Sequence, residues 1–206
     1  MQQRRLCQLA LVALLALPLP CGAATIATIE GTLSDYDQLG MGVFTLVDPA
    51  WVWIQMWSHG GGTASDGTVV AGGNFDPVIW LFRGDTTGPG AGSATFVVSN
   101  DDGDCPPANP GLFGCVDSSL GYVPGGQPAL VLEPGTYSVV VTVYSKNFQG
   151  GPGDPFSNGF NSVPPDLYDN AGPEYFVDVQ GIPEPPAGAV TGLSLIGLAL
   201  MSRRKP

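Results

Sequence analysis

Apolar and polar positions alternate with a period of two along most of this chain, and no stretch has the 3.6-residue period of a convincing amphipathic helix. Clusters of Gly, Pro, Asn and Asp separate the alternating runs, as they separate short strands in all-β domains. The segment 149–172 is rich in Gly, Pro and Asn and is predicted to be a long surface loop, which is unusual in a compact domain. Eight strands are predicted, over residues 25–33, 43–47, 51–57, 78–82, 94–99, 129–132, 137–144 and 175–179.

The predicted strand 51–57 carries three tryptophans. Strand alternation gives one face made of Trp51, Trp53, Gln55 and Trp57, and another made of Val52, Ile54 and Met56. The aliphatic face suits a core. For the tryptophan face two interpretations stand: an exposed platform for sugar rings or a partner, or, as we favour, indoles buried beneath the long loop.

The N-terminal residues 1–24 have the pattern of a secretory signal peptide. Arg4 and Arg5 precede a short apolar stretch, and Gly22 and Ala24 stand at positions −3 and −1 of a cleavage site. The apolar stretch is too short for a membrane-spanning helix, which needs about 20 residues. We therefore expect cleavage after Ala24.

The C-terminal residues 183–206 have three parts in order. The first is a Pro-Glu-Pro motif at Pro183, Glu184 and Pro185. An almost uncharged run over residues 187–201 follows, and a basic cluster of Arg203, Arg204 and Lys205 comes last. The arrangement resembles the PEP-CTERM sorting signal of Gram-negative bacteria. The resemblance implies a transmembrane segment over 187–201 with a cytoplasmic basic end, and cleavage near the motif by an exosortase-type membrane peptidase. The mature protein would pass through the inner membrane to the cell surface or its polysaccharide matrix.

Without its two ends the chain is one predicted domain, residues 25–182, and it is strongly acidic. All eighteen acidic residues lie between Glu30 and Glu184, together with only Arg83 and Lys146, so the formal charge of this interval is −16, against −11 for the whole chain. This charge argues against nucleic acid and anionic lipid as partners. It favours divalent cations, or simply solubility outside the cell.

The cysteines predict one disulfide. Cys7 and Cys21 are removed with the signal peptide. Cys21 also raises the alternative of a lipoprotein, but the residues just before a lipidated cysteine are usually small, and here they are Leu19 and Pro20. Cys105 and Cys115 remain, and two cysteines in an exported protein are expected to pair. A zinc site is the alternative, but His59 is the only histidine and is distant in sequence.

Four short motifs occur in a fixed order: FDPVIWLF at 75–82, SNDDG at 99–103, DS at 117–118 and LEPGTY at 132–137. Together they resemble the bacterial pre-peptidase C-terminal (PPC-like) domain, in particular single-domain exported proteins with PEP-CTERM tails. The resemblance covers about residues 30–181. It implies a jelly-roll-like antiparallel β-sandwich, often with calcium-organised loops, that serves as an accessory module rather than a catalyst.

The densest polar cluster predicts a calcium site. Calcium takes six to eight oxygen ligands, and neighbouring carboxylates repel one another without a cation. The alternative is a solvated acidic turn. The spacing of the acidic residues after Asn100 is not that of an EF-hand loop. Asp76 precedes a proline, and Asp-Pro is equally a turn signal. The candidate ligands are Asn100, Asp101, Asp102, Asp104, Asp117 and Asp76.

No catalytic constellation is recognisable, and we expect no enzyme. His59 lies in a Gly-rich segment without a nucleophile-elbow motif. The leading interpretation is a non-catalytic exported surface or exopolysaccharide-matrix protein with calcium-stabilised loops. One alternative is a carbohydrate-binding module that uses Trp51, Trp53 and Trp57. The other is a secreted hydrolase, because a glycosidase needs only two carboxylates.

Overall fold

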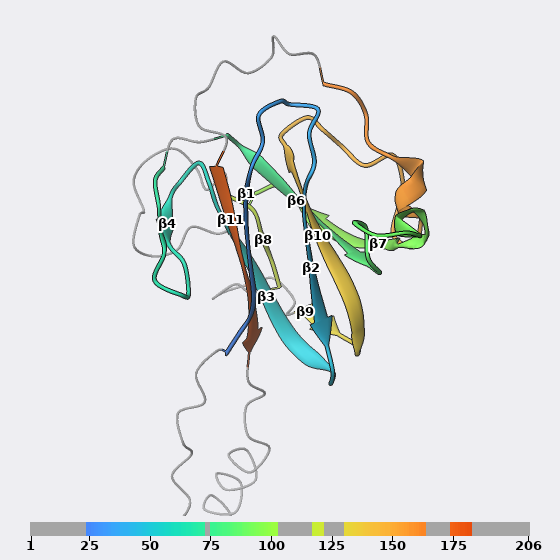
Figure 1. The fold of residues 1–206 in the computed structure, drawn as a ribbon, viewed down its shortest axis with the longest axis horizontal. Coiled ribbons are helices and arrows are strands. Elements are labelled where there is room, and N and C mark those ends of the chain that lie inside the picture. Colours follow the sequence, from blue (N-terminus) through green and yellow to red (C-terminus); the bar gives the residue numbers. More distant parts are fainter. Residues whose placement is uncertain (1–23, 73–74, 103–116, 122–129, 164–173, 183–206) are drawn as a thin grey trace, which may run out of the picture. The chain divides into compact units, whose positions relative to one another are not determined.

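A computed structural model describes residues 24–72, 75–102, 117–121, 130–163 and 174–182 (Figure 1). In these ranges the chain forms eleven β-strands and two short 3-10 helices, with no α-helix. All strand pairs are antiparallel, so the all-β prediction is confirmed. Each of the eight predicted strands coincides with an observed strand, with ends that differ by a few residues.

The first sheet, which we call sheet A, has β11 and β3 at its centre. Strand β1 pairs with one edge of β11, and two short strands share the free edge of β3. The members in order are β1 (Ala24–Thr32), β11 (Glu174–Ile182), β3 (Ala50–Trp57), and β8 (Ser119–Leu120) with β9 (Leu130–Leu132).

The second sheet, sheet B, has four strands, with β10 and β6 at its centre. Its long central strand, β10, pairs residue for residue with both neighbours. The order is β2 (Gly40–Leu46), β10 (Gly135–Val143), β6 (Pro77–Arg83) and β7 (Thr95–Asn100).

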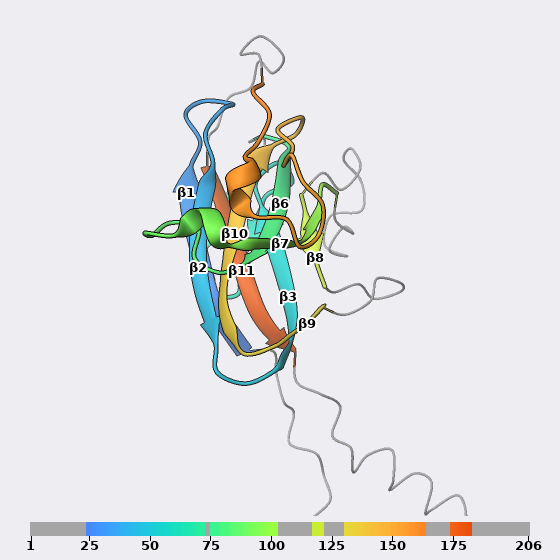
Figure 2. The same ribbon diagram turned by 90° about the vertical axis from the view of Figure 1, so that its right-hand side faces the viewer.

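The main core lies between the two sheets, which pack against each other in a sandwich-like arrangement (Figure 2). Sheet A contributes Val52, Ile54 and Met56, all fully buried, as the alternation in this strand predicts. Sheet B contributes Ile79 and Leu81 from β6, also fully buried, with alternate valines of β10. The predicted aliphatic face of residues 51–57 is therefore the core face.

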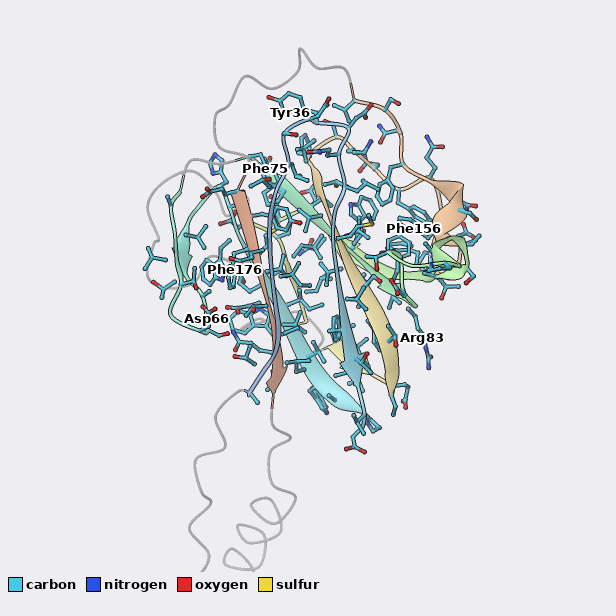
Figure 3. The ribbon with its side chains drawn as sticks, in the orientation of Figure 1. Tyr36, Asp66, Phe75, Arg83, Phe156 and Phe176 are labelled. Carbon is cyan, nitrogen blue, oxygen red and sulfur yellow. The ribbon has the colours of Figure 1, made fainter. Side chains whose placement is uncertain are left out.

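A second hydrophobic cluster covers the outer face of sheet B. Trp80 and Phe82 point away from the main core and pack against Phe148 and Phe160, with ring centroids 5.1–6.5 Å apart. Phe156, on the 3-10 helix η2 (Phe156–Asn158), meets the Phe82 ring edge to face at 5.1 Å (Figure 3). The described part of the predicted long loop, residues 149–163, is thus a packed cover of sheet B. This is why β6 is apolar on both faces.

A small hairpin that the sequence did not predict lies against the outer face of sheet A. It consists of β4 (Gly62–Thr63) and β5 (Val69–Val70). Gly62 has no side chain, and a Cβ there would lie 2.3 Å from the Trp57 ring. Only glycine allows the hairpin to approach the sheet this closely.

Several predictions concern residues outside the described ranges. These are residues 1–23 of the signal peptide, the tail 183–206 with its Pro183, Glu184, Pro185, Arg203 and Arg204, the disulfide Cys105–Cys115, and Asp104. They remain predictions. Among the residues that the structure describes, no helix is long and apolar enough to cross a membrane.

Candidate functional site at the acidic end

The candidate site lies at the end of the sheets where β3 and β7 finish and β6, β8 and β11 begin. Two buried serines join these elements. The Ser118 hydroxyl lies 2.6 Å from the Pro77 carbonyl oxygen and 2.7 Å from that of Asp101. The Ser58 hydroxyl lies 3.1 Å from the Phe75 carbonyl oxygen. These bonds satisfy buried backbone acceptors and fix the relative positions of the loops that carry the aspartates.

Asp117 holds the chain just after β3. Its carboxylate accepts the backbone N–H groups of Ser58 (3.1 Å), His59 (2.7 Å) and Gly60 (2.9 Å). Asp117 is 8% exposed, and burial raises the pKa of its carboxyl group, against the opposing effect of these three hydrogen bonds. The two oxygens are already engaged by backbone groups, so Asp117 acts first as an anchor of the 58–60 loop and adds a negative charge to the site.

Asp76 is the most perturbed carboxyl group of this end. Its Oδ1 atom is buried and has no hydrogen-bond partner among the residues that the structure describes. Burial is the main reason why its pKa rises from 3.8 to about 6, and the negative charges of Asp101, Asp102 and Asp117 raise it further. The His59 side chain acts in the opposite direction. A buried carboxylate oxygen without a donor, facing like charges, is unfavourable unless a proton or a cation compensates it.

The loop after β7 carries the remaining predicted ligands. Burial and the neighbouring Asp102 raise the pKa of the Asp101 carboxyl group. The Asn100 side chain has a structural role, because its amide donates to the carbonyl oxygens of Ser119 (2.8 Å) and Asp102. Its Oδ1 accepts the backbone N–H of Asp101 at 3.1 Å. Asn100 therefore shapes the turn and ties it to β8.

The four described aspartates form one electrostatic group without forming a complete metal cage. Within the described ranges, no three His, Cys, Asp or Glu side chains are grouped so that they could hold a metal ion. Asp76, Asp101, Asp102 and Asp117 belong to separate sequence motifs, and the fold brings them together. The proximity of His59 to Asp76 and Asp117 could not be predicted, because nothing in the sequence relates residue 59 to residues 76 and 117.

The tryptophan face of β3 is partly covered. Trp51 is 38% exposed, whereas Trp53 and Trp57 are half-buried. Trp57 lies beneath the β4–β5 hairpin, and its indole N–H is 3.5 Å from the Asp178 carboxylate. The described part of the predicted long loop, residues 149–163, packs on sheet B and not over the tryptophan face. The segment that covers Trp57 is the β4–β5 hairpin.

Comparisons with known proteins give no relative. No family model, no curated protein and no solved structure matches this chain.

Proposed function

We propose that this chain is a non-catalytic, exported surface or exopolysaccharide-matrix protein whose acidic end is stabilised by calcium. The observation that carries the calcium part is Asp76, whose buried Oδ1 has no partner among the described residues and whose pKa is raised to about 6 beside three other aspartates. A divalent cation would replace the proton that this group otherwise retains up to about pH 6. The finer fold, a jelly-roll sandwich of PPC-like type, belongs to the same proposal.

Asp76 would be the first calcium ligand, and the side chains of Asp101 and Asp102, which act on it electrostatically but are not grouped with it as a metal site, would have to move toward it on binding. Asp117 would contribute its negative charge without coordinating the ion, because its oxygens already accept the backbone N–H groups of residues 58–60. Carbonyl oxygens, water and Asp104, which lies outside the described ranges, would have to complete the six to eight ligands. Bound calcium would supply charge neutralisation and hold the loops after β7 and before β6 together.

The register of β1 and β11 places the first and last described residues at the end of the domain opposite the acidic site. Ala24 pairs with Gly181, so the first strand begins where the last strand finishes. Thr32 pairs with Glu174 at the other end of the same two strands, next to the acidic site. Strands of nine residues separate the two ends by roughly 25–30 Å.

Thermal unfolding tests the calcium part. The full-length chain in detergent, with calcium or with a chelator, should melt several degrees higher with calcium, because a ligand that binds only the folded state stabilises it. Asp76→Asn and Asp101→Asn should lose most of this increase. Glu133→Gln removes one exposed charge near the opposite end and should retain it. An equal melting temperature with calcium and with chelator would contradict the proposal.

A second candidate, a carbohydrate-binding module, is favoured by one observation. Trp51 is 38% exposed and pairs across β3 and β9 with Val131, which is 52% exposed. Such a flat apolar surface can pack against the face of a sugar ring. Trp51→Ala should then remove binding on a glycan array while Val47→Ala, at an exposed loop position, leaves it intact. Unchanged binding in Trp51→Ala would exclude this surface.

A further inference from the structure

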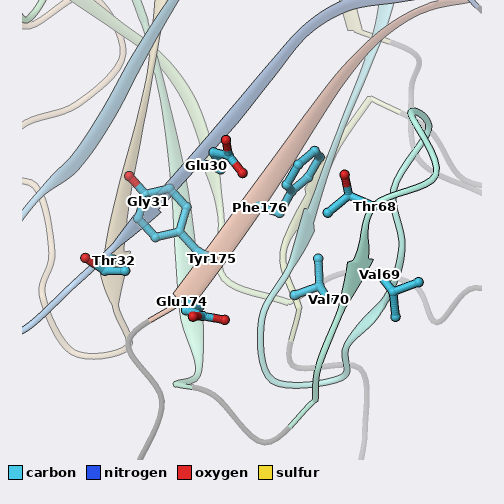
Figure 4. Close-up of a pocket in the computed structure, with 9 residues that line it drawn as sticks. All are labelled: Glu30, Gly31, Thr32, Thr68, Val69, Val70, Glu174, Tyr175 and Phe176. Carbon is cyan, nitrogen blue, oxygen red and sulfur yellow. The ribbon is translucent and has the colours of Figure 1, made fainter.

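A pocket of about 340 Å³ lies between sheet A and the β4–β5 hairpin (Figure 4). One wall is formed by β1 and β11, which contribute Glu30 and Glu174, and the other by Thr68 and Val70 of the hairpin. Phe176, only 4% exposed, lies between them. The pocket volume falls within the range of small-ligand sites.

The hairpin wall of the pocket is held firmly to the sheet. The Asp178 carboxylate accepts the backbone N–H of Ser65 at 2.6 Å and its hydroxyl at 2.7 Å. Within the hairpin, Ala64 donates its N–H to the Thr68 carbonyl oxygen at 2.8 Å, and Thr68 donates its N–H to the Asp66 carboxylate at 2.8 Å. The pocket therefore exists before any ligand binds, which lowers the entropic cost of binding.

The two carboxylates of the pocket belong to the same face of the sheet. Glu30 pairs with Phe176, and Glu174 lies two residues before Phe176 on β11, so the two acids are diagonal neighbours, roughly 7–8 Å apart at the backbone. Both are exposed. Of the two basic residues that the structure describes, Lys146 pairs with Asp37 and Arg83 contacts the Pro134 carbonyl oxygen. Neither lines the pocket.

This chemistry selects a class of ligand. Ionised carboxylates only accept hydrogen bonds, so the ligand must present donors on two sides and preferably a positive charge. Phe176 and Val70 suit apolar C–H groups between these donors, and the Thr32 and Thr68 hydroxyls can bond to further polar groups at the rim. A lysine or arginine side chain offers one cationic head on an apolar stem. A sugar ring that bears an amine offers donors around its edge.

We propose that this pocket binds a saccharide unit with a free amino group, a cationic hexosamine, and rejects uronic acids. The proposal deepens the matrix role proposed above and rests on it only for the natural source of the sugar. The residues of this pocket are not those assigned to calcium. A negative calcium experiment would therefore not contradict sugar binding, and a negative sugar-binding experiment would not contradict the calcium site.

Titration calorimetry with a glucosamine trisaccharide at pH 6 tests the proposal on the full-length chain in detergent. The free-amine trisaccharide should bind, while the N-acetylated trisaccharide and a galacturonic acid trisaccharide should not. Glu30→Gln and Glu174→Gln should each weaken binding at least tenfold. Val70→Lys, at the hairpin position whose side chain faces the sheet (Figure 4), should abolish binding, because it places an ammonium group beside the two carboxylates.

Matched controls separate a site from general attraction to an acidic protein. Glu133→Gln and Asp85→Asn each remove one exposed charge elsewhere and should leave binding unchanged. Equal weakening by these controls would overturn the proposal, as would equal binding of the acetylated trisaccharide. Tighter binding of trilysine that is lost in Glu30→Gln would also overturn it, in favour of a basic peptide. Unchanged melting temperatures would show that each variant is folded.

Discussion

The carboxylate of Asp178 on β11 binds both the backbone N–H and the hydroxyl of Ser65, 113 residues earlier in the chain, at 2.6 and 2.7 Å. Asp178 is only 1% exposed, and its buried carboxylate is satisfied by these two bonds and by a longer one from the Trp57 indole N–H. This pair attaches the β4–β5 hairpin to sheet A. It thereby covers Trp57 and forms one wall of the pocket.

Asp178→Ala should lower the free energy of unfolding by about 2–4 kcal/mol, because hydrogen bonds to charged groups contribute about 1.5–3 kcal/mol each and are not additive. Hydrogen exchange should increase in residues 62–70 before it increases in any strand of sheet A. Ser65→Ala retains the N–H bond and should cost less. Asp48→Ala, at an exposed loop position, is the control. Equal stability of Asp178→Ala and Asp48→Ala would show that the hairpin is held by other contacts.

Asp76 should make the protein less stable as the pH rises from about 4 to about 6. Its folded-state pKa of about 6 lies above the ordinary 3.8, so over this window the folded chain binds more protons than the unfolded chain, and unfolding becomes easier as they are lost. After allowance for partial exposure the effect is about 1–2 kcal/mol. The raised pKa values of Asp101 and Asp117 act in the same direction.

Urea unfolding at pH 4.5 and 7.5 in chelator measures this effect. Asp76→Asn should be more stable than the unmodified chain at pH 7.5 and less dependent on pH. The same pH dependence in both chains would mean that the Asp76 carboxyl group is not the source.

The Lys146–Asp37 ion pair should respond asymmetrically to substitution. Lys146 is 5% exposed and donates to the Asp37 carboxylate at 2.9 Å and to the Asn161 carbonyl oxygen at 3.0 Å. Asp37→Ala leaves a buried ammonium group without its counter-charge, whereas Lys146→Met leaves a carboxylate that is half exposed. Denaturant titration should therefore show a larger loss for Asp37→Ala. The reverse order would contradict the assigned burial of Lys146.

Phe148 should be essential to the cover of sheet B. It is 7% exposed and its ring contacts those of Trp80, Phe82 and Phe96. Phe148→Ala should cost about 3–5 kcal/mol, as other large-to-small core substitutions do, and should increase hydrogen exchange in residues 145–163. Val47→Ala, at a position 84% exposed, should change stability by less than about 0.5 kcal/mol. A similar small effect of Phe148→Ala would mean that the loop contributes little to the fold.

The strands of this fold could be predicted because alternation is a local signal. It located all eight longer strands and the core face of β3, since burial of Val52, Ile54 and Met56 follows from their spacing. The hairpin β4–β5 and the short β8 were missed because two-residue strands carry no period. The packing of residues 149–163 was missed because Phe156 and Phe160 stand among Gly and Pro, a composition typical of loops.

The candidate site was predictable in part for a related reason. Asp101 and Asp102 are adjacent in sequence and invite attention as a cluster. The position of Asp76 next to them depends on the pairing of β6 with β7, and the use of Asp117 by the 58–60 backbone depends on contacts nearly 60 residues apart. The pocket acids Glu30 and Glu174 were not singled out, because only the pairing of β1 with β11 makes them neighbours.

Calcium titration of the full-length chain at pH 7.0 tests whether the acidic end binds calcium through Asp76. We expect saturable binding with release of part of a proton, because a group with a pKa of about 6 is still partly protonated. Asp76→Asn should lose both the binding and the proton release, while Glu133→Gln keeps them. Absence of binding heat in every buffer, or equal binding by Asp76→Asn, would show that Asp76 does not bind calcium.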